Sequence, residues 1–346
     1  MSSDLMQNYR IDPADLPGEA VIFGSTAAMR EIRSVIDCVL SSDLPVLIQG
    51  ESGTGKEVVA RFLHSRSNRR EAPFVRMSCA AVPVNLLESE LFGREKGACG
   101  RAHEDRQGLI EVAHGGTLFL DEIGDLPWEM QGDLIHLLRD GSYTRVGGSQ
   151  TLRGNTRIIC AANCDLQSAV EAGSFRADLF RRIDVVSLHL SALRERKNDI
   201  PQLCEYLLQK LARRFGRNVP QLSPGTIQRL KQWDWPGNLR ELENWVARVI
   251  ILGDEGALDS HFRRQVAVAN ESDYRKLRFR AMNGVSRRSR PVVPSTLILK
   301  VLQANRGSRK KTAEELRMSY RSLLCRLRES GLPRRRISHR GLPPAR

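Results

Sequence analysis

Apolar residues follow two alternating patterns over roughly the first 190 positions of the chain. Short apolar runs lie at 46–49, 117–120 and 157–161, and between them apolar residues recur at helical spacing. Strand-sized runs that alternate with helix-length segments are typical of a parallel sheet with crossover helices. This pattern therefore predicts an α/β domain built on a parallel sheet.

Beyond residue 190 the helical spacing continues without strand-sized runs. Apolar positions predict helices over Ile200–Phe215, Ser223–Trp233 and Asn238–Leu252, and helical spacing returns over 295–333. Between these regions the segment VSRRSRPVVP is rich in Pro, Ser and Arg, as linkers are. We expect a polar lead-in, an α/β part with a helical subdomain, a linker, a small all-helical domain and a basic tail: 1–20, 21–252 (divided near 190/191), 253–294, 295–333 and 334–346.

Charge divides the chain more sharply than hydropathy does. Residues 1–261 carry 31 basic and 35 acidic side chains, whereas residues 262–346 carry 23 basic and 5 acidic ones, a net of +18. So lopsided a tail predicts a polyanionic partner, with nucleic acid as the first candidate. The chain has no apolar run of the ~18–20 residues that a membrane helix needs, no secretory signal pattern and no C-x-x-C pair among its seven cysteines. We therefore expect a cytoplasmic protein with reduced thiols.

A glycine-rich segment after the first apolar run carries the first candidate chemistry. Residues 50–57 read GESGTGKE and precede a helical pattern. A strand, a glycine loop and a helix form the setting of a P-loop, whose backbone N–H groups surround phosphates while its lysine reaches the β- and γ-phosphates. The candidate nucleotide-binding residues are Gly50, Glu51, Ser52, Gly53, Thr54, Gly55, Lys56 and Glu57.

Two acids end the second apolar run. The segment 115–122 reads GGTLFLDE, and an apolar strand that ends in two acids is the Walker B arrangement. Asp121 is the candidate ligand of Mg²⁺, and Glu122 is the candidate base that orients and deprotonates the attacking water. Both acids together favour ATP hydrolysis over nucleotide binding alone.

These motifs and their neighbours resemble the AAA+ domain of bacterial enhancer-binding proteins, the NtrC-type activators of sigma-54 RNA polymerase. The resemblance spans about residues 21–252 and includes GESGTGKE, in which Glu at position 57 is the family's own variant. The other similar segments are ESELFGREKGA at 88–98, GGTLFLDEIGDLP at 115–127, FRADLFRRIDVVSLHLSALRERKNDI at 175–200 and WPGNLRELEN at 235–244; residues 295–333 resemble a Fis-type helix-turn-helix.

The resemblance implies a fold and a set of roles. It implies an α/β P-loop AAA+ domain with a parallel sheet and a helical lid, followed by a small all-α Fis-type helix-turn-helix domain. Arg176 and Arg182 lie at the spacing of the family's arginine fingers, which reach the nucleotide of a neighbouring subunit, so the resemblance implies a ring, with a hexamer as the expected form. Three further positions match family sites: Asn163 (sensor I), Arg240 (sensor II) and Phe23 with Gly24 (adenine pocket).

The chain departs from the family pattern at two places. Ser78 in MSCAA replaces the asparagine of the family's NCAA segment, which pairs with the Walker B glutamate; a serine hydroxyl can still bond a carboxylate, so we expect altered coupling and retained hydrolysis. The sigma-54 contact loop, GAFTGA in the family, reads Gly97, Ala98, Cys99, Gly100, Arg101 and Ala102. The exposed aromatic and the hydroxyl of that loop are therefore missing.

The C-terminal helices predict a DNA-reading unit. A second helix in the major groove with lysines and arginines on phosphates is the usual arrangement. The candidate contacts are Arg309, Lys310, Lys311, Tyr320, Arg321, Ser322, Arg326 and Arg328.

Three functions remain open at this point. The first is an ATP-hydrolysing, DNA-binding regulator that remodels sigma-54 polymerase. The second is a regulator of the same family that no longer activates sigma-54: a repressor, an activator of the housekeeping polymerase or a subunit of a mixed ring. The third is an AAA+ remodeller or loader of other DNA-bound proteins. Twenty residues before the ATPase are too few for a receiver domain, so we expect control by a partner protein, by expression level or by the altered loop.

Overall fold

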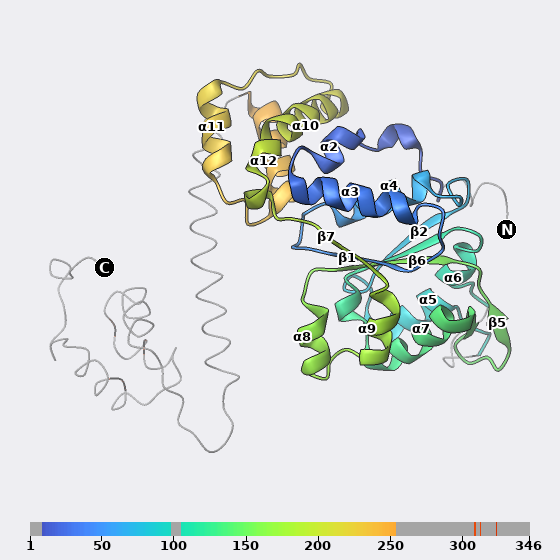
Figure 1. Ribbon diagram of the computed structural model, residues 1–346. Coiled ribbons are helices and arrows are strands. Elements are labelled where there is room, and N and C mark those ends of the chain that lie inside the picture. The colour runs from blue at the N-terminus through green and yellow to red at the C-terminus, as the bar shows by residue number, and fades with distance from the viewer. Residues whose placement is uncertain (1–8, 98–104, 254–307, 309–311, 313–322, 324–346) are drawn as a thin grey trace. The chain divides into compact units, whose positions relative to one another are not determined.

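The computed structural model describes residues 9–97 and 105–253 and three isolated positions, 308, 312 and 323. The chain divides into two compact units, Met1–Ala257 and Leu258–Arg346. The description that follows is of the first unit. Its colours run from blue to yellow-orange along the chain in Figure 1.

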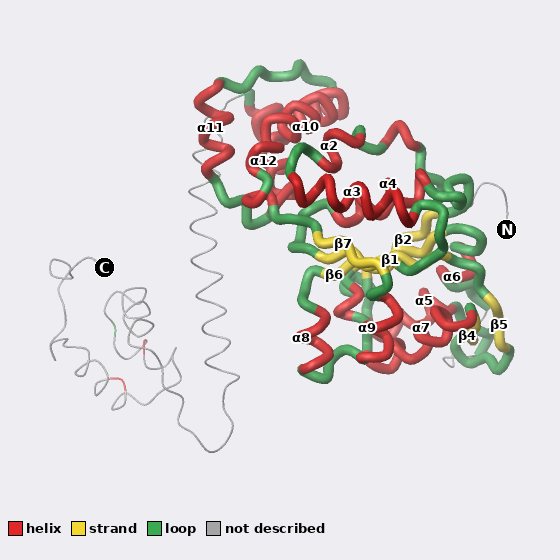
Figure 2. Tube along the Cα trace, viewed as in Figure 1, coloured by secondary structure: helices red, strands yellow, loops and turns green. Residues whose placement is uncertain are grey.

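A five-stranded parallel sheet forms the centre of this unit (Figure 2), in the order β2-β3-β6-β1-β7. Its strands are β1 (Val46–Gln49), β2 (Phe74–Ser78), β3 (Thr117–Asp121), β6 (Arg157–Ala162) and β7 (Val186–His189). The three predicted strands are confirmed and form the three inner positions. The two edge strands, β2 and β7, were not predicted, because exposed and polar side chains interrupt their apolar pattern.

Helices cover both faces of the sheet (Figure 1), which is why the inner strands are apolar on both sides. Val46 and Ile48 point into the core beneath α2, α3 and α4, whereas Leu47 points into the core beneath α5 to α9, as the two-residue period of a strand requires. The helices are α2 (Glu19–Phe23), α3 (Ala27–Val39), α4 (Lys56–Arg66), α5 (Val84–Phe92), α6 (Leu109–Val112), α7 (Trp128–Asp140), α8 (Leu166–Glu171) and α9 (Ala177–Ile183).

Three helices follow the sheet and form the lid: α10 (Ile200–Phe215), α11 (Pro224–Gln232) and α12 (Asn238–Leu252). The predicted bounds of α10 and α12 are confirmed, and α11 is one residue shorter at each end. Ser223 caps α11 through its hydroxyl, which accepts from the N–H of Thr226 at 3.2 Å. The fold class predicted from the sequence is therefore confirmed for the part of the chain that is described.

A small antiparallel hairpin, β4 (Ser142–Thr144) with β5 (Thr151–Arg153), lies beside the residues that flank the predicted contact loop. On either side of the loop, Arg94 and Arg106 form two backbone hydrogen bonds with each other, both of 2.9 Å. The Val146 N–H donates to the Gly93 carbonyl at 2.9 Å. The base of the loop is thus fixed to the hairpin. Of the loop residues themselves, only Gly97 lies within the described positions.

Four 3₁₀ turns complete the described elements: Pro13–Asp15, Ile123–Asp125, Leu193–Glu195 and Lys197–Asp199. Within residues 9–97 and 105–253, no helix has the length and apolarity to span a membrane. The cysteines of this part are free thiols: Cys38, Cys79, Cys160, Cys164 and Cys204.

Candidate functional site

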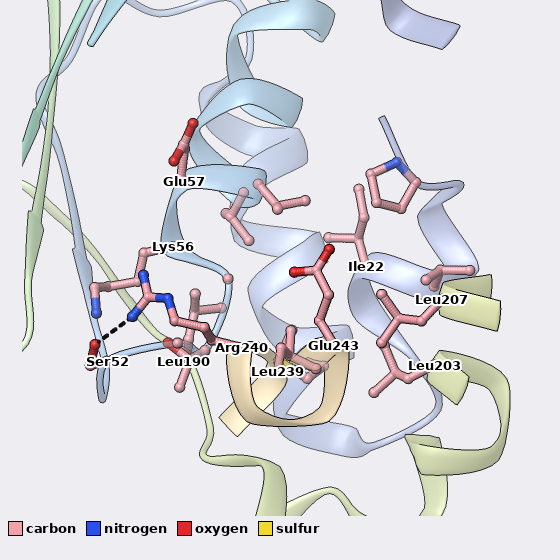
Figure 3. Close-up of a pocket in the computed structure, with 18 of the residues that line it drawn as sticks. Ile22, Ser52, Lys56, Glu57, Leu190, Leu203, Leu207, Leu239, Arg240 and Glu243 are labelled. Carbon is pink, nitrogen blue, oxygen red and sulfur yellow. Dashed lines mark hydrogen bonds between the residues drawn. The ribbon is translucent and has the colours of Figure 1, made fainter. Parts of the chain in front are cut away.

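A cavity of about 300 Å³ opens between the carboxyl end of the sheet and the lid. The carboxyl ends of parallel strands are where open α/β sheets bind ligands. Its walls come from the glycine loop, the ends of β3 and β6, the N-terminal segment before α3, and the lid helices α10 and α12. Figure 3 shows the loop and lid side chains around it.

The glycine loop lies directly beneath the lid. Gly55, the N-cap residue before α4, adopts φ 99°, and Gly53 adopts φ 80°, conformations that residues with a Cβ avoid. A Cβ on Gly53 would lie 2.4 Å from the Gly237 carbonyl oxygen, so the close approach of loop and lid also requires glycine. The first turn of α4 follows at once and supplies N–H groups and a positive dipole end to the cavity.

Lys56 is buried at the base of the cavity. Its Nζ donates to the carbonyl oxygens of Gly50 at 2.7 Å and Glu51 at 3.0 Å. Burial lowers the pKa of this ammonium group, and the nearby Asp121 and Glu122 oppose that shift. The lysine is therefore held within reach of any phosphate that enters the loop.

The two acids predicted after the second apolar run both line the cavity. Ser78 donates from its hydroxyl to Glu122 Oε2 at 3.0 Å, so the structure brings these two predicted residues together. Glu122 adopts φ 56°, which is uncommon for a residue other than glycine. This turn directs the side chain of Glu122 to the end of β2, where Ser78 lies.

Arg76 joins the acids of the two motifs, and the sequence did not predict it. Its guanidinium contacts Asp121 Oδ2 at 2.9 Å and Glu57 Oε2 at 2.7 Å. The strand register pairs Ser78 with Asp121, which places Arg76 two residues earlier on the same face of β2. The position of Arg76 beside Asp121 could be inferred only after β2 was known to be a strand next to β3.

The lid is bonded to the glycine loop by several residues. Arg240, the predicted sensor II residue, donates to Ser52 Oγ at 3.0 Å (Figure 3). Asn238 donates to the Ser52 carbonyl at 3.0 Å, and Arg194 forms a bidentate ion pair with Glu51 at 2.6 and 2.8 Å. The hydrogen bond from Arg194 holds the pKa of Glu51 below its ordinary value. Neither Asn238 nor Arg194 was predicted from the sequence as a site residue.

The apolar part of the cavity is lined by residues other than Phe23 and Gly24, the two residues predicted for the adenine pocket. Phe23 is buried and meets the ring of Phe62 edge-on at 5.2 Å, and Gly24 lies against Asp199; neither lines the cavity. Ile22, one position earlier on α2, lies in the wall instead (Figure 3). Helical rotation of about 100° per residue explains the exchange. The other apolar wall residues are Pro17, Val21, Leu203 and Leu207.

Asn163 follows β6 and lines the cavity, whereas the two predicted finger arginines do not. Arg176 precedes α9, is ion-paired with Asp178 at 3.2 Å and lies 5.4 Å from the ring centroid of Trp128. Arg182 is in the last turn of α9. Neither arginine is placed to meet a ligand in the cavity of its own chain.

Several predicted site residues lie outside the described positions. In the contact loop these are Ala98, Cys99, Gly100, Arg101 and Ala102. In the DNA-binding segment they are Arg309, Lys310, Lys311, Tyr320, Arg321, Ser322, Arg326 and Arg328.

Comparison with known protein families gives three consecutive matches. Residues 22–189 match the sigma-54 interaction domain, residues 194–277 the AAA+ ATPase lid domain, and residues 293–329 the bacterial regulatory protein family Fis. The order agrees with the sheet, the lid and the C-terminal segment.

Individual proteins resemble the chain over different shares of their length. The regulatory protein AtoC of Escherichia coli K12 is 40% identical over 316 residues, which cover 90% of this chain and 68% of AtoC. The DNA-binding transcriptional activator HyfR of the same organism is 47% identical over 240 residues, but these cover only 36% of HyfR. The crystal structure of NtrX from Brucella abortus in complex with ATP aligns with a TM-score of 0.64 at 31% identity, covering 95% of this chain and 71% of that one.

Proposed function

The chain belongs to the sigma-54 activator family of AAA+ ATPases, and from that premise we propose that it is a cytoplasmic, DNA-binding transcription regulator that hydrolyses ATP to remodel sigma-54 RNA polymerase. The observation that carries the proposal is the cavity in which Lys56, Asp121 and Glu122 meet beneath a lid. Groups that bind phosphate, orient a cation and activate water are the parts that phosphoryl transfer to water requires.

The cavity suits a triphosphate at one end and an adenine at the other. The glycine loop and the N-terminus of α4 offer N–H donors to the phosphates, and Lys56 would exchange its loop carbonyls for phosphate oxygens. Ile22, Leu203 and Leu207 offer apolar surface to a flat base. The ATP complex of NtrX, a protein of the same fold, supports ATP as the nucleotide.

The donor set fits Mg²⁺. Asp121 offers a hard carboxylate oxygen at the cavity wall, whereas the described residues contain no cluster of three or more His, Cys, Asp or Glu that could hold a metal alone. Mg²⁺ is usually held by one or two carboxylates together with substrate phosphates and water, so Asp121 is sufficient from the protein side. Bound Mg²⁺ would neutralise charge on the phosphates.

Glu122 is the proposed base. Its carboxylate would accept a proton from the attacking water, and the hydrogen bond from Ser78 holds it toward β2. Release of that bond would free both carboxylate oxygens for the water. Ser78 is thus proposed to control when Glu122 acts, and Asn163, at the cavity wall, is proposed to contact the γ-phosphate region.

Arg176 and Arg182 are proposed to act on the nucleotide of a neighbouring copy. Their position outside the cavity of their own chain supports this, because a finger arginine that acts in trans must lie on the surface. A guanidinium on the transition-state phosphate contributes ~10³–10⁵ in turnover in other NTPases. The active form would then be a ring, for which a hexamer is proposed.

The C-terminal segment is proposed to bind promoter or enhancer DNA. It matches the Fis family and lies in the region that carries the +18 charge. The affinity should fall steeply with salt, since each phosphate contact releases counterions. Control of activity is proposed to come from a partner protein or from the contact loop.

A second candidate function follows from the sequence of that loop. GACGRA offers no aromatic or threonine to sigma-54, which favours a family member that binds DNA and ATP without activating sigma-54. Such a protein would act as a repressor, with the housekeeping polymerase or within a mixed ring.

One experiment separates the two candidates. The purified protein is mixed with sigma-54 in the presence of ADP–aluminium fluoride, and capture and open-complex formation are measured. A triple variant, Cys99→Phe, Gly100→Thr and Arg101→Gly, restores the family loop and is the matched control. Capture by both proteins supports sigma-54 remodelling; capture by the restored variant alone rejects it in favour of the second candidate.

A further inference from the structure

One arginine bridges the two nucleotide motifs. Arg76 Nη2 lies 2.9 Å from Asp121 Oδ2, and Arg76 Nη1 lies 2.7 Å from Glu57 Oε2. Glu57 follows the P-loop lysine, and its side chain points along α4 beside the cavity (Figure 3). A single guanidinium therefore contacts both the first turn of α4 and the end of β3.

The placement of Arg76 follows from the sheet. β2 is an edge strand, and its residues at alternate positions share a face, so Arg76 and Ser78 both approach the acids that end β3. Ser78 bonds Glu122 and Arg76 bonds Asp121. One strand thus supplies a separate partner to each of the two acids.

Arg76 and a divalent cation are both positively charged, so they repel each other near the same carboxylate. Asp121 is the carboxylate proposed to hold Mg²⁺, and its Oδ2 already accepts from the guanidinium. A cation on Asp121 would lie within a few ångströms of a fixed positive charge, and like charges at that distance repel measurably even near a protein surface. Arg76 and the cation therefore weaken each other's binding to this carboxylate.

We infer that Arg76 competes with Mg²⁺ for Asp121 and so sets the Mg²⁺ concentration at which nucleotide binding becomes tight. Arg76 is a positioning residue in this role, since it acts through the carboxylate. Its side chain is 42% exposed, which leaves it room to turn toward Glu57 when the cation binds. The inference rests on the proposed nucleotide-binding function and adds a control on its cation requirement.

The test is a titration with Mg²⁺ at fixed protein and a fluorescent, non-hydrolysable ATP analogue, and it measures binding. Arg76→Gln should lower the Mg²⁺ midpoint by roughly three- to fivefold, the size expected for a partly exposed ion pair. Arg76→Met should give the same shift, and Arg76→Lys, which keeps the charge, should stay near the wild type. A midpoint that is unchanged or raised in folded Arg76→Gln and Arg76→Met overturns the inference.

Arg61→Gln is the matched control. Arg61 pairs with Glu57 at 3.0 Å and has no contact with Asp121, so its removal should leave the midpoint unchanged. An equal shift in Arg61→Gln would assign the effect to Glu57 and reject competition at Asp121. Failure of the wild type to bind the analogue at any Mg²⁺ concentration would refute the proposed function itself, a result distinct from normal binding with an unshifted midpoint.

Discussion

The nucleotide cavity and the surface at α9 differ in how their charged groups are held. In the cavity, Lys56 is buried and bonded to two carbonyls, and beside it Glu51 of the glycine loop is fixed by a bidentate arginine. At α9, Arg176 is held by one exposed aspartate and the face of an indole. The cavity is assembled within one chain, whereas the α9 surface presents its arginines outward.

This difference suggests separate roles for the two regions, with nucleotide binding in the cavity and a contribution to hydrolysis from the α9 surface. Exposed contacts such as those of Arg176 are weak because water screens them, so this guanidinium can exchange its partners for a phosphate at small cost. The bonds of the cavity are made in advance and favour immediate nucleotide binding. Binding should therefore need one copy of the chain, and hydrolysis should need two.

Loss of Lys56 should have the largest effect on ATP affinity. Lys56→Ala removes the only P-loop ammonium group, and charge-assisted hydrogen bonds of this kind are worth about 1.5–3 kcal/mol each, so affinity for ATP should fall on the order of 100-fold. Isothermal titration calorimetry measures the dissociation constant for ATP. Lys197→Ala, which removes a half-buried lysine paired with Asp234 at the lid, is the control and should bind normally. Near-native affinity in Lys56→Ala would contradict the assigned cavity.

Loss of Arg182 should distinguish most clearly between ATP binding, which depends on the cavity, and ATP turnover, which is proposed to depend on the α9 surface. Arg182→Ala should lower ATP turnover by ~10³ while ATP affinity stays within about twofold, because the residue lies outside the cavity. Arg181→Ala removes the adjacent exposed arginine and should leave turnover nearly unchanged. Steady-state turnover is measured at saturating ATP. Equal losses in both variants would argue against a specific finger.

Mixing two inactive variants tests action in trans. Lys56→Ala has an intact α9 and Arg182→Ala has an intact cavity, so mixed assemblies should recover a measurable fraction of wild-type turnover, up to about a quarter if neighbours pair at random. Absence of any recovery, with mixed assembly verified by cross-linking, would place the arginine and the nucleotide in the same chain.

A methyl group on Gly53 should damage the cavity by an intermediate amount. Its Cβ would lie 2.4 Å from the Gly237 oxygen, so Gly53→Ala must move the lid or strain the loop, at ~1–3 kcal/mol and about a tenfold loss of ATP affinity. Gly225→Ala, at a position with nothing within 4 Å of the new Cβ, is the matched control in the lid. Unchanged affinity in Gly53→Ala would show that loop and lid separate freely.

Removal of the indole beside Arg176 should have the smallest effect. Trp128→Leu loses the stacking surface and should reduce turnover by about two- to fivefold with unchanged ATP affinity, since cation–π contacts at exposed sites are weak. Trp128→Phe keeps an aromatic face and should be closer to the wild type. Full turnover in Trp128→Leu would mean that the indole does not orient Arg176.

Much of the fold and the core of the site could be predicted from sequence because they depend on neighbours along the chain. The inner strands, α10 and α12 follow from the spacing of apolar residues, and the glycine loop and the strand-end acids occupy short segments. Edge strands β2 and β7 were missed, because polar or partly exposed residues interrupt their apolar runs.

The phosphate loop and the two acids could be predicted from a few adjacent residues each, and the lid helices from the spacing of apolar residues along each helix. Only the tertiary structure placed Arg76 between Glu57 and Asp121, brought Arg194 to Glu51 from 143 residues away and turned Ile22 into the cavity in place of Phe23. The physical reason is distance along the chain: backbone conformation depends on local residues, whereas the partner of a charged side chain depends on which distant segments the packed core brings to it.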